Sequence, residues 1–388
     1  MERRPIRSRL ARLGAGGWNR SLATQLAAVL LFSAVVWTTA ADVSRAAGAG
    51  RLVDNQAAFM HARPFLTPAE GPLSTLTGAF DLTHDFVSAL RLERCFGAAA
   101  RGPGSSDCSA QELGLTVTPT PAELTRDYVG TLLIQPCPQK EGEGLLRGCA
   151  SGTSPAEATR HIALVGDSHA GRWQQGFTMV AGRLGWHVDH FAKLGCPFSA
   201  LTRPIAGLST DECVEWKRQL RAWLAARPEI DTLFVAQLSQ PYRGQKRLED
   251  DIAGYQRQWR TLPKSIKQIV VLRDNPRSGR ETLRCISRAL AVHKSPGASC
   301  ALPRKRVLEA YPDAAAAAAR RMASPRVGVV DLTNIYCNSS VCYPVIGGVM
   351  VTSDKSHLTP LFLGTLMPYV LQALQRGKWL GQVSNPYL

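Results

Sequence analysis

Short apolar runs alternate with longer amphipathic segments from residue 161 onward. The runs have the length and β-branched character of buried strands, at 162–165, 186–191, 232–236, 268–272 and 327–332. The helical segments that follow them end at 184 or cover 209–226, 248–262, 307–323 and 360–374. Buried strands that alternate with helices require a parallel sheet with both faces covered. The pattern therefore predicts an α/β domain, which we place at residues 158–380.

A different pattern marks the amino end. Residues 22–41 carry no charged side chain, and a helix of that length spans about 30 Å, the hydrocarbon thickness of a bilayer. The basic tail before it, residues 1–21, has six arginines against one glutamate. The positive-inside rule therefore predicts a single-pass membrane anchor with a cytoplasmic tail and an extracytoplasmic C-terminal part. The alternative is a signal peptide cleaved near Ala47-Gly48-Ala49, which would give a secreted protein.

Residues 43–157 lack a regular pattern, and loop signals such as 101–106 (RGPGSS) and 118–121 (TPTP) interrupt them. We interpret this range as an irregular extracytoplasmic segment pinned by disulfide bonds rather than a second catalytic domain.

The ten cysteines all follow residue 42, on the expected extracytoplasmic side, where disulfide bonds form and persist. Sequence does not fix their connectivity. Pairing each cysteine with its neighbour gives five short loops, closed by Cys95–Cys108, Cys137–Cys149, Cys196–Cys213, Cys285–Cys300 and Cys337–Cys342.

The net charge of +16 over 388 residues first suggests nucleic acid as a partner. Five of these sixteen charges lie in the amino-terminal tail, where they are a topology signal. The remaining basic clusters, such as 304–306, have no interleaved aromatic residues and no nucleic-acid motif. We therefore expect no nucleic-acid partner.

Two short motifs carry the candidate chemistry. The first, Gly166-Asp167-Ser168-His169, stands where the first strand turns into the first helix, and ligand sites form at the carboxyl ends of parallel strands. A serine at a helix N-terminus lies where partial positive charge favours an oxyanion. A serine N-cap with no catalytic role would give the same tetrapeptide.

The second motif, 354–359 (DKSHLT), precedes the last helix. Its Asp354 and His357 are three residues apart, so a carboxylate can orient an imidazole that activates a serine hydroxyl. His187-x-x-His190 lies on a predicted strand, where positions three apart face opposite sides, so we expect no metal site there. His169 either lines the site or makes a structural hydrogen bond.

Together these motifs resemble the SGNH (GDSL-type) hydrolase superfamily. Residues 158–375 most resemble the extracytoplasmic SGNH domain at the C-terminus of bacterial membrane acyltransferases that O-acylate cell-surface glycans. Four further stretches support this, at 195–197 (GCP), 271–276 (VLRDNP), 331–333 (DLT) and 342–348 (CYPVIGG).

The resemblance implies a flavodoxin-like three-layer α/β/α fold with about five parallel strands and no cofactor. It assigns Ser168 as nucleophile, His357 as base and Asp354 as its orienting acid. The Ser168 N–H and the Gly195 region match the oxyanion-hole donors. Its implied partners are an acyl donor, a glycan acceptor and a multi-span membrane acyltransferase.

The chain departs from the family pattern in two places. The block after strand 232–236 normally supplies an asparagine donor, but here it reads Gln237-Leu238-Ser239-Gln240. Gln237 or Gln240 could donate instead, and Gln237 is our candidate. The second departure is that one hydrophobic segment stands where the family has a multi-helix membrane domain. The chain is thus either a stand-alone domain with a separate membrane partner or a fragment of a longer protein.

Two functions fit these observations. The first is an extracytoplasmic serine O-acyltransferase or acylesterase that acts on acyl esters of cell-surface glycans. The alternative, suggested by the altered block, is a catalytically silent domain that binds glycans or scaffolds a partner.

Overall fold

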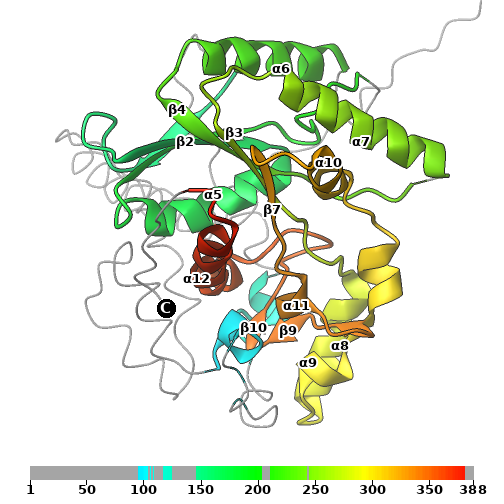
Figure 1. Cartoon of the computed structure of the whole chain (residues 1–388). Coiled ribbons are helices and arrows are strands. Elements are labelled where there is room, and N and C mark those ends of the chain that lie inside the picture. The colour runs from blue at the N-terminus through cyan, green and yellow to red at the C-terminus, as the bar shows by residue number, and fades with distance from the viewer. Residues whose placement is uncertain are drawn as a thin grey trace, which may run out of the picture. The chain divides into compact units, whose positions relative to one another are not determined.

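Six strands form the central sheet, in the order β1-β3-β2-β4-β5-β7 (Figure 1). Their bounds are β1 Cys149–Gly152, β2 Arg160–Gly166, β3 Trp186–Ala192, β4 Ile230–Ala236, β5 Gln268–Leu272 and β7 Val327–Val330. All pairs from β3 to β7 are parallel. Counted along the chain, these five strands lie in the order 2-1-3-4-5, one of the common orders of doubly wound sheets. The predicted α/β class with a mostly parallel sheet is confirmed.

The computed structural model describes residues 95–103, 105, 108, 117–124, 146–202, 210–242 and 244–380. These residues all fall within one unit, Gln56–Leu388. The expected tail 1–21, the membrane segment 22–41, Cys137 and much of 43–157 lie outside the described residues. None of the helices in the described ranges combines the length and apolar character that crossing a bilayer requires.

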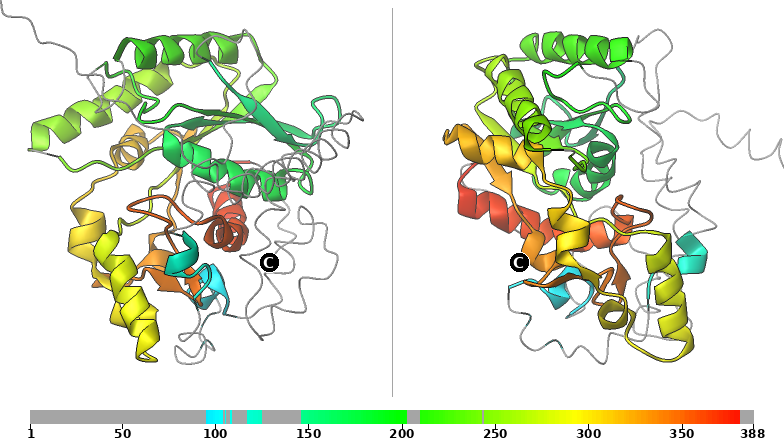
Figure 2. Two further views of the ribbon diagram at one scale, coloured as in Figure 1. Left: turned by 180° about the vertical axis from the view of Figure 1, so that it is seen from behind. Right: turned by 90° about the vertical axis from the view of Figure 1, so that its right-hand side faces the viewer.

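Helices cover both faces of the sheet because successive strand residues point to opposite sides. On β2, Ile162 and Leu164 belong to one core, whereas Ala163 and Val165 belong to the other. Figures 1 and 2 show α5 and α12 on one side and α6, α7 and α10 on the other. Their bounds are α5 Ser168–Ala181, α6 Thr210–Ala225, α7 Gln245–Arg260, α10 Ala314–Met322 and α12 Pro360–Gly377.

The edge strand β1 was not expected, since it lies within the range 43–157. It pairs antiparallel with β3, so that Ser151 faces Val188 in register. None of its four residues is buried. The strand therefore gives no apolar signal in the sequence, and only its pairing partner defines it.

The prediction of one continuous helix over 307–323 is wrong. A π-helical turn covers Lys305–Glu309, and α10 begins only at Ala314. Pro312 separates them, because the residue before a proline is disfavoured in helical conformation. Asp313 then caps α10, accepting a hydrogen bond of 2.8 Å from the Ala316 N–H.

A small third core lies beside the sheet domain. In this core, Val117 from the segment 117–124 packs with Ile286 and Met350. Ile286 belongs to α8 (Arg280–Ala291), a helix that the sequence pattern did not predict. The remaining short elements are η3 Gly97–Ala100, α9 Pro296–Ser299, β6 Leu302–Pro303, α11 Thr333–Tyr336, β8 Val341–Cys342, β9 Val345–Ile346 and β10 Val349–Met350.

Four of the five expected disulfide bonds are present: Cys95–Cys108, Cys196–Cys213, Cys285–Cys300 and Cys337–Cys342. Cys149 is also disulfide-bonded, and its expected partner Cys137 lies outside the described residues.

Candidate active site

The turn from β2 into α5 presents Ser168 at the first position of the helix. Asp167 is the N-cap, and its Oδ1 accepts a hydrogen bond of 2.9 Å from the His169 N–H. Its Oδ2 accepts one of 2.9 Å from the Leu238 N–H, which ties this turn to the loop after β4. Position 166 requires glycine because the neighbouring strand passes close to it, and a Cβ there would lie 1.9 Å from the carbonyl oxygen of Ala236. The half-buried Ser168 hydroxyl is thus held at the carboxyl edge of the sheet.

The structure brings the three predicted catalytic side chains together. Nε2 of His357 lies 2.9 Å from Oγ of Ser168, and its Nδ1 lies 2.6 Å from Oδ2 of Asp354. Because a carboxylate only accepts hydrogen bonds, Nδ1 carries the proton, and Nε2 is left to accept from the serine hydroxyl. This is the order of contacts that a serine nucleophile, its base and the orienting acid require.

Asp354 also organises its own loop. Its Oδ1 accepts hydrogen bonds of 2.8 Å from the backbone N–H groups of both Ser356 and His357. Burial by itself would raise the pKa of Asp354, but the hydrogen bond and charge of His357, together with these N–H groups, hold that pKa well below its usual range. The carboxylate is therefore ionised wherever the imidazole can act as a base.

Apart from the Ser168 N–H itself, the candidate oxyanion donors lie in the loops that follow β3 and β4. The loop that carries Gly195 is held against the nucleophile turn, because the Lys193 N–H donates to the Gly166 carbonyl at 3.0 Å. Gly195 adopts φ +66°, a backbone conformation that favours glycine. Gln237 follows β4 directly and is 4% exposed. Gln240, the second glutamine of that block, is exposed.

A comparison of the chain with known protein families identifies its family. Residues 136–372, more than half of the chain, match the family described as "SGNH domain (fused to AT3 domains)". The chain belongs to this SGNH domain family. The match begins before residue 158, the expected domain start, and so includes β1.

A search of solved structures adds one similarity. The chain matches the periplasmic domain of a lipopolysaccharide acetyltransferase from Salmonella ser. Paratyphi A, with 10% identity and a TM-score of 0.45. The match covers 66% of this chain and 95% of that one. No curated protein matches the chain.

A second histidine–carboxylate pair lies inside this SGNH domain, between His169 and Asp274. Their Nδ1 and Oδ1 atoms are 2.6 Å apart, and both side chains are almost fully buried. Burial lowers the pKa of His169, but the Asp274 carboxylate outweighs it and raises the pKa above its ordinary value. For Asp274, burial raises the pKa, and the charge and hydrogen bond of His169 outweigh it, so the pKa falls. Both shifts favour the pair as an imidazolium and a carboxylate.

The His169–Asp274 pair also reaches the base loop. Nε2 of His169 lies 3.3 Å from the Ser356 hydroxyl, and Nδ2 of Asn275 donates to the Ser356 carbonyl at 2.8 Å. His169 therefore makes the structural hydrogen bond that was one of the two alternatives for it. Asp274 had a signal in the sequence, since it stands in the family-like stretch 271–276, but its pairing with His169 depends on tertiary packing.

Another serine–histidine hydrogen bond lies at the sheet edge of the SGNH domain, where Oγ of Ser151 is 2.7 Å from Nε2 of His190. It lacks the features of the Ser168 site. Nδ1 of His190 has no hydrogen-bond partner among the described residues, and burial lowers the pKa of His190 to about 3. Ser151 lies on a strand rather than at a helix N-terminus. This pair hints at chemistry, but its geometry is weaker than that of Ser168 and His357.

No group of histidine, cysteine or carboxylate side chains in the described ranges is arranged to hold a metal ion. In the His187-x-x-His190 sequence, Nδ1 of His187 lies 2.8 Å from the Thr153 carbonyl, while His190 contacts Ser151.

Proposed function

We propose that the SGNH domain is an extracytoplasmic serine O-acyltransferase or acylesterase that acts on acyl esters of cell-surface glycans. The observation that carries this proposal is the continuous hydrogen-bonded path from Asp354 through His357 to Ser168 at the N-terminus of α5. The fold supports it as well, since the 2-1-3-4-5 strand order fits a flavodoxin-like sheet with its site at the carboxyl edge.

In the acylation step, Oγ of Ser168 attacks the carbonyl carbon of the acyl donor, and its proton passes to Nε2 of His357. The tetrahedral intermediate then collapses, and the imidazolium gives that proton to the leaving alcohol. Asp354 stabilises the imidazolium while it exists. In the second step His357 deprotonates a sugar hydroxyl or a water, which takes the acyl group and restores the serine.

The negative charge that develops on the carbonyl oxygen needs donors. We assign this role to the Ser168 and Gly195 N–H groups and to the Gln237 amide in place of the family asparagine. Loss of one such donor costs roughly 3–4 kcal/mol in a preorganised site, so Gln237 bears directly on catalytic strength.

The disulfide bonds and the family support a proposal about the cellular setting. Disulfide bonds are typical of extracytoplasmic proteins, and four are present in the described ranges. We propose a single-pass anchor at 22–41 with its tail inside the cell. Because this family is fused to AT3 domains, we propose a membrane acyltransferase as the partner that delivers the acyl donor.

The test uses the full-length chain with 4-nitrophenyl acetate as substrate and a fluorophosphonate as serine-reactive probe. The proposal requires labelling at Ser168 and a fall in kcat of about 10³-fold or more in Ser168→Ala. Ser151→Ala is the matched control, because it removes the other histidine-bonded serine, and it should retain activity. Full activity in Ser168→Ala would refute the proposal.

The second candidate is a catalytically silent domain that binds glycans or scaffolds a partner. The block Gln237-Leu238-Ser239-Gln240, in place of the family asparagine, favours it. A folded native chain that is neither labelled nor active on the ester would support this candidate.

A further inference from the structure

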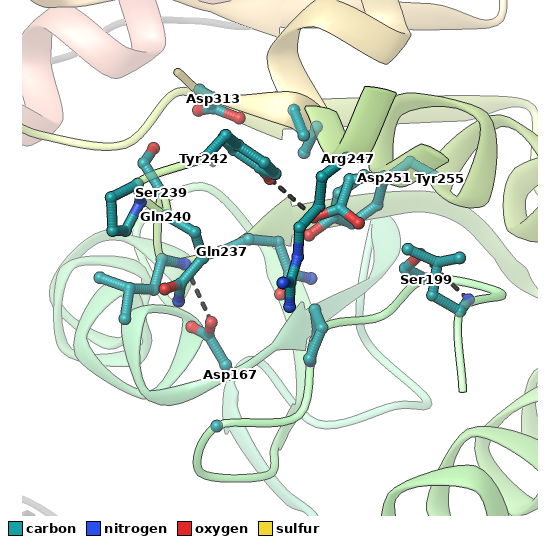
Figure 3. A pocket seen from close by; sticks show the side chains of 17 residues that line it. Asp167, Ser199, Gln237, Ser239, Gln240, Tyr242, Arg247, Asp251, Tyr255 and Asp313 are labelled. Atoms are coloured by element: carbon teal, nitrogen blue, oxygen red, sulfur yellow. Dashed lines mark hydrogen bonds between the residues drawn. The ribbon is translucent and has the colours of Figure 1, made fainter. Parts of the chain in front are cut away.

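A cavity of about 470 Å³ opens beside the nucleophile turn (Figure 3). Asp167, which precedes Ser168, and Gly195 form one end of its wall. The rest of the wall comes from the loop after β3, the loop after β4, α7 and the start of α10. This volume lies within the range of small-molecule sites, roughly 300–1,000 Å³. Neither Ser168 nor His357 lines the cavity, so it is a neighbouring space rather than the catalytic centre itself.

The cavity wall contains a buried side-chain amide that has no hydrogen-bond partner in the described part of the chain. Gln237 is 4% exposed, and neither its Oε1 nor its Nε2 has a hydrogen bond with any described residue. The backbone that follows is fully engaged, because the Leu238 and Ser239 N–H groups donate to Asp167 and Asp274. Buried polar groups are almost always paired, so such an exception needs a reason. A ligand in the cavity would supply both the donor and the acceptor that this amide lacks.

Arg247, on α7, adds a cluster of donors to the same space. Its guanidinium forms no hydrogen bond or ion pair with the described residues, and Figure 3 shows it extending from α7 into the cavity toward the Gln237 amide. Tyr242 is engaged differently, since its hydroxyl donates to Oδ2 of Asp251 at 2.7 Å. Gln237 and Arg247 are thus two polar side chains of the wall that form no hydrogen bond with the described residues and can bind a ligand.

The chemistry of the wall selects the ligand class. Its acidic side chains, Asp167, Asp251 and Asp313, outnumber the single cation Arg247. A carboxylate or phosphate ligand would face those acids, and an acyl chain would leave the buried Gln237 amide unpaired. Hydroxyl groups both donate and accept, so a neutral polyhydroxylated ligand satisfies the amide and the guanidinium together.

We propose that this cavity is the acceptor subsite and binds a neutral sugar unit through Gln237 and Arg247. The assignment deepens the proposed function and rests on it, because it places the sugar beside the carbonyl that Ser168 would attack. Gln237 can serve both roles, with its Nε2 toward the oxyanion and its Oε1 toward a sugar hydroxyl. The two roles can be separated experimentally, because sugar binding does not need the nucleophile.

Binding is therefore measured in the full-length Ser168→Ala background by saturation-transfer NMR. The probes are the methyl glycosides of glucose, galactose, mannose and N-acetylglucosamine, with glucuronate as an anionic probe and octanoate as an acyl probe. At least one neutral glycoside should bind more tightly than glucuronate and octanoate. Arg247→Ala and Gln237→Leu should each weaken its binding about tenfold or more. Lys246→Ala, an exposed neighbour on α7 that does not line the cavity, should leave the binding unchanged.

Three results would overturn the inference: no neutral glycoside binds, glucuronate or octanoate binds best, or both cavity variants bind the sugar as well as their parent. If Gln237→Leu slows ester turnover in the native chain but leaves sugar binding intact, the amide is an oxyanion donor only, and its assignment here is wrong. Arg247 is exposed, so its variant tests the site even if Gln237→Leu folds poorly. Sugar binding with no labelling at Ser168 would keep the subsite and reject the proposed catalysis.

Discussion

His169 and Asp274 form a buried hydrogen bond of 2.6 Å next to the candidate catalytic pair, and the ring centroids of His169 and His357 are 5.0 Å apart. The two histidines come from the two motifs that the sequence singles out. Asp274, two residues after β5, contacts the first motif through His169, and its Oδ2 also accepts the Ser239 N–H at 2.7 Å. One carboxylate thus links the nucleophile turn and the loop after β4, and its histidine partner contacts the base loop.

Replacing Asp274 by asparagine should destabilise the fold. The change removes the counter-charge of a buried imidazolium, and breaking a buried pair on one side typically costs about 3–5 kcal/mol. Urea unfolding at pH 7 would measure the loss. Glu249→Gln serves as the control, because its partner Arg321 lies at the surface, and its effect should stay within experimental scatter. A change in Asp274→Asn no larger than that of the control would contradict a charged buried pair.

Replacing Asp354 by asparagine should reduce catalysis while leaving the loop folded. The asparagine oxygen can still accept the backbone N–H groups of Ser356 and His357, but it no longer stabilises an imidazolium. Loss of the orienting carboxylate lowers kcat on the order of 10³–10⁴-fold in serine hydrolases of this design. Turnover of 4-nitrophenyl acetate measures the effect, with the melting temperature as a check on folding. Activity within tenfold of the native chain would argue against the assigned role.

The candidate triad could be predicted because both motifs are local. A strand-to-helix turn fixes Ser168, and three residues of one loop place Asp354 against His357. The β2 and β4 strands were equally clear, since their runs are apolar on both faces. What escaped prediction depends on partners distant in sequence. The edge strand β1 carries no apolar pattern, and α8 buries Ile286 in a small separate core rather than against the sheet.

The cavity was likewise beyond sequence reasoning. Arg247 is indistinguishable from a solvated helix residue until α7 is seen beside the loop after β4. Gln237 gave a partial signal, because it occupies the place of the family asparagine. That its amide is buried with no hydrogen-bond partner among the residues described by the structure depends on the packing around it.

The pH dependence of stability should contain a contribution from Asp313. Burial raises the pKa of this carboxyl from 3.8 to about 6, against hydrogen bonds that would lower it. A raised carboxyl pKa means that the folded state binds the proton more tightly than the unfolded state. The stabilisation is therefore present below pH 4 and is lost as pH rises through 6, by up to about 3 kcal/mol.

The Asp313→Asn variant isolates this contribution. Its unfolding free energy, relative to the native chain, should rise between pH 4 and pH 7, as measured by urea unfolding at each pH. Asp354→Asn should show the opposite trend at acid pH, because the lowered pKa of Asp354 gives stability that is lost as pH falls. A constant difference between Asp313→Asn and the native chain across this range would show that the carboxyl is not perturbed.

The Gly166→Ala substitution should disrupt the nucleophile turn. Its Cβ would lie 1.9 Å from the Ala236 carbonyl oxygen, which belongs to the neighbouring strand and cannot move freely. Overpacking of this kind costs about 1–3 kcal/mol, and the shift should also displace Ser168, two residues later, from its 2.9 Å contact with His357. Urea unfolding and labelling of Ser168 measure the two effects. Gly279→Ala is the control, because nothing lies within 4 Å of its Cβ, and native-like labelling of Gly166→Ala would contradict the close approach.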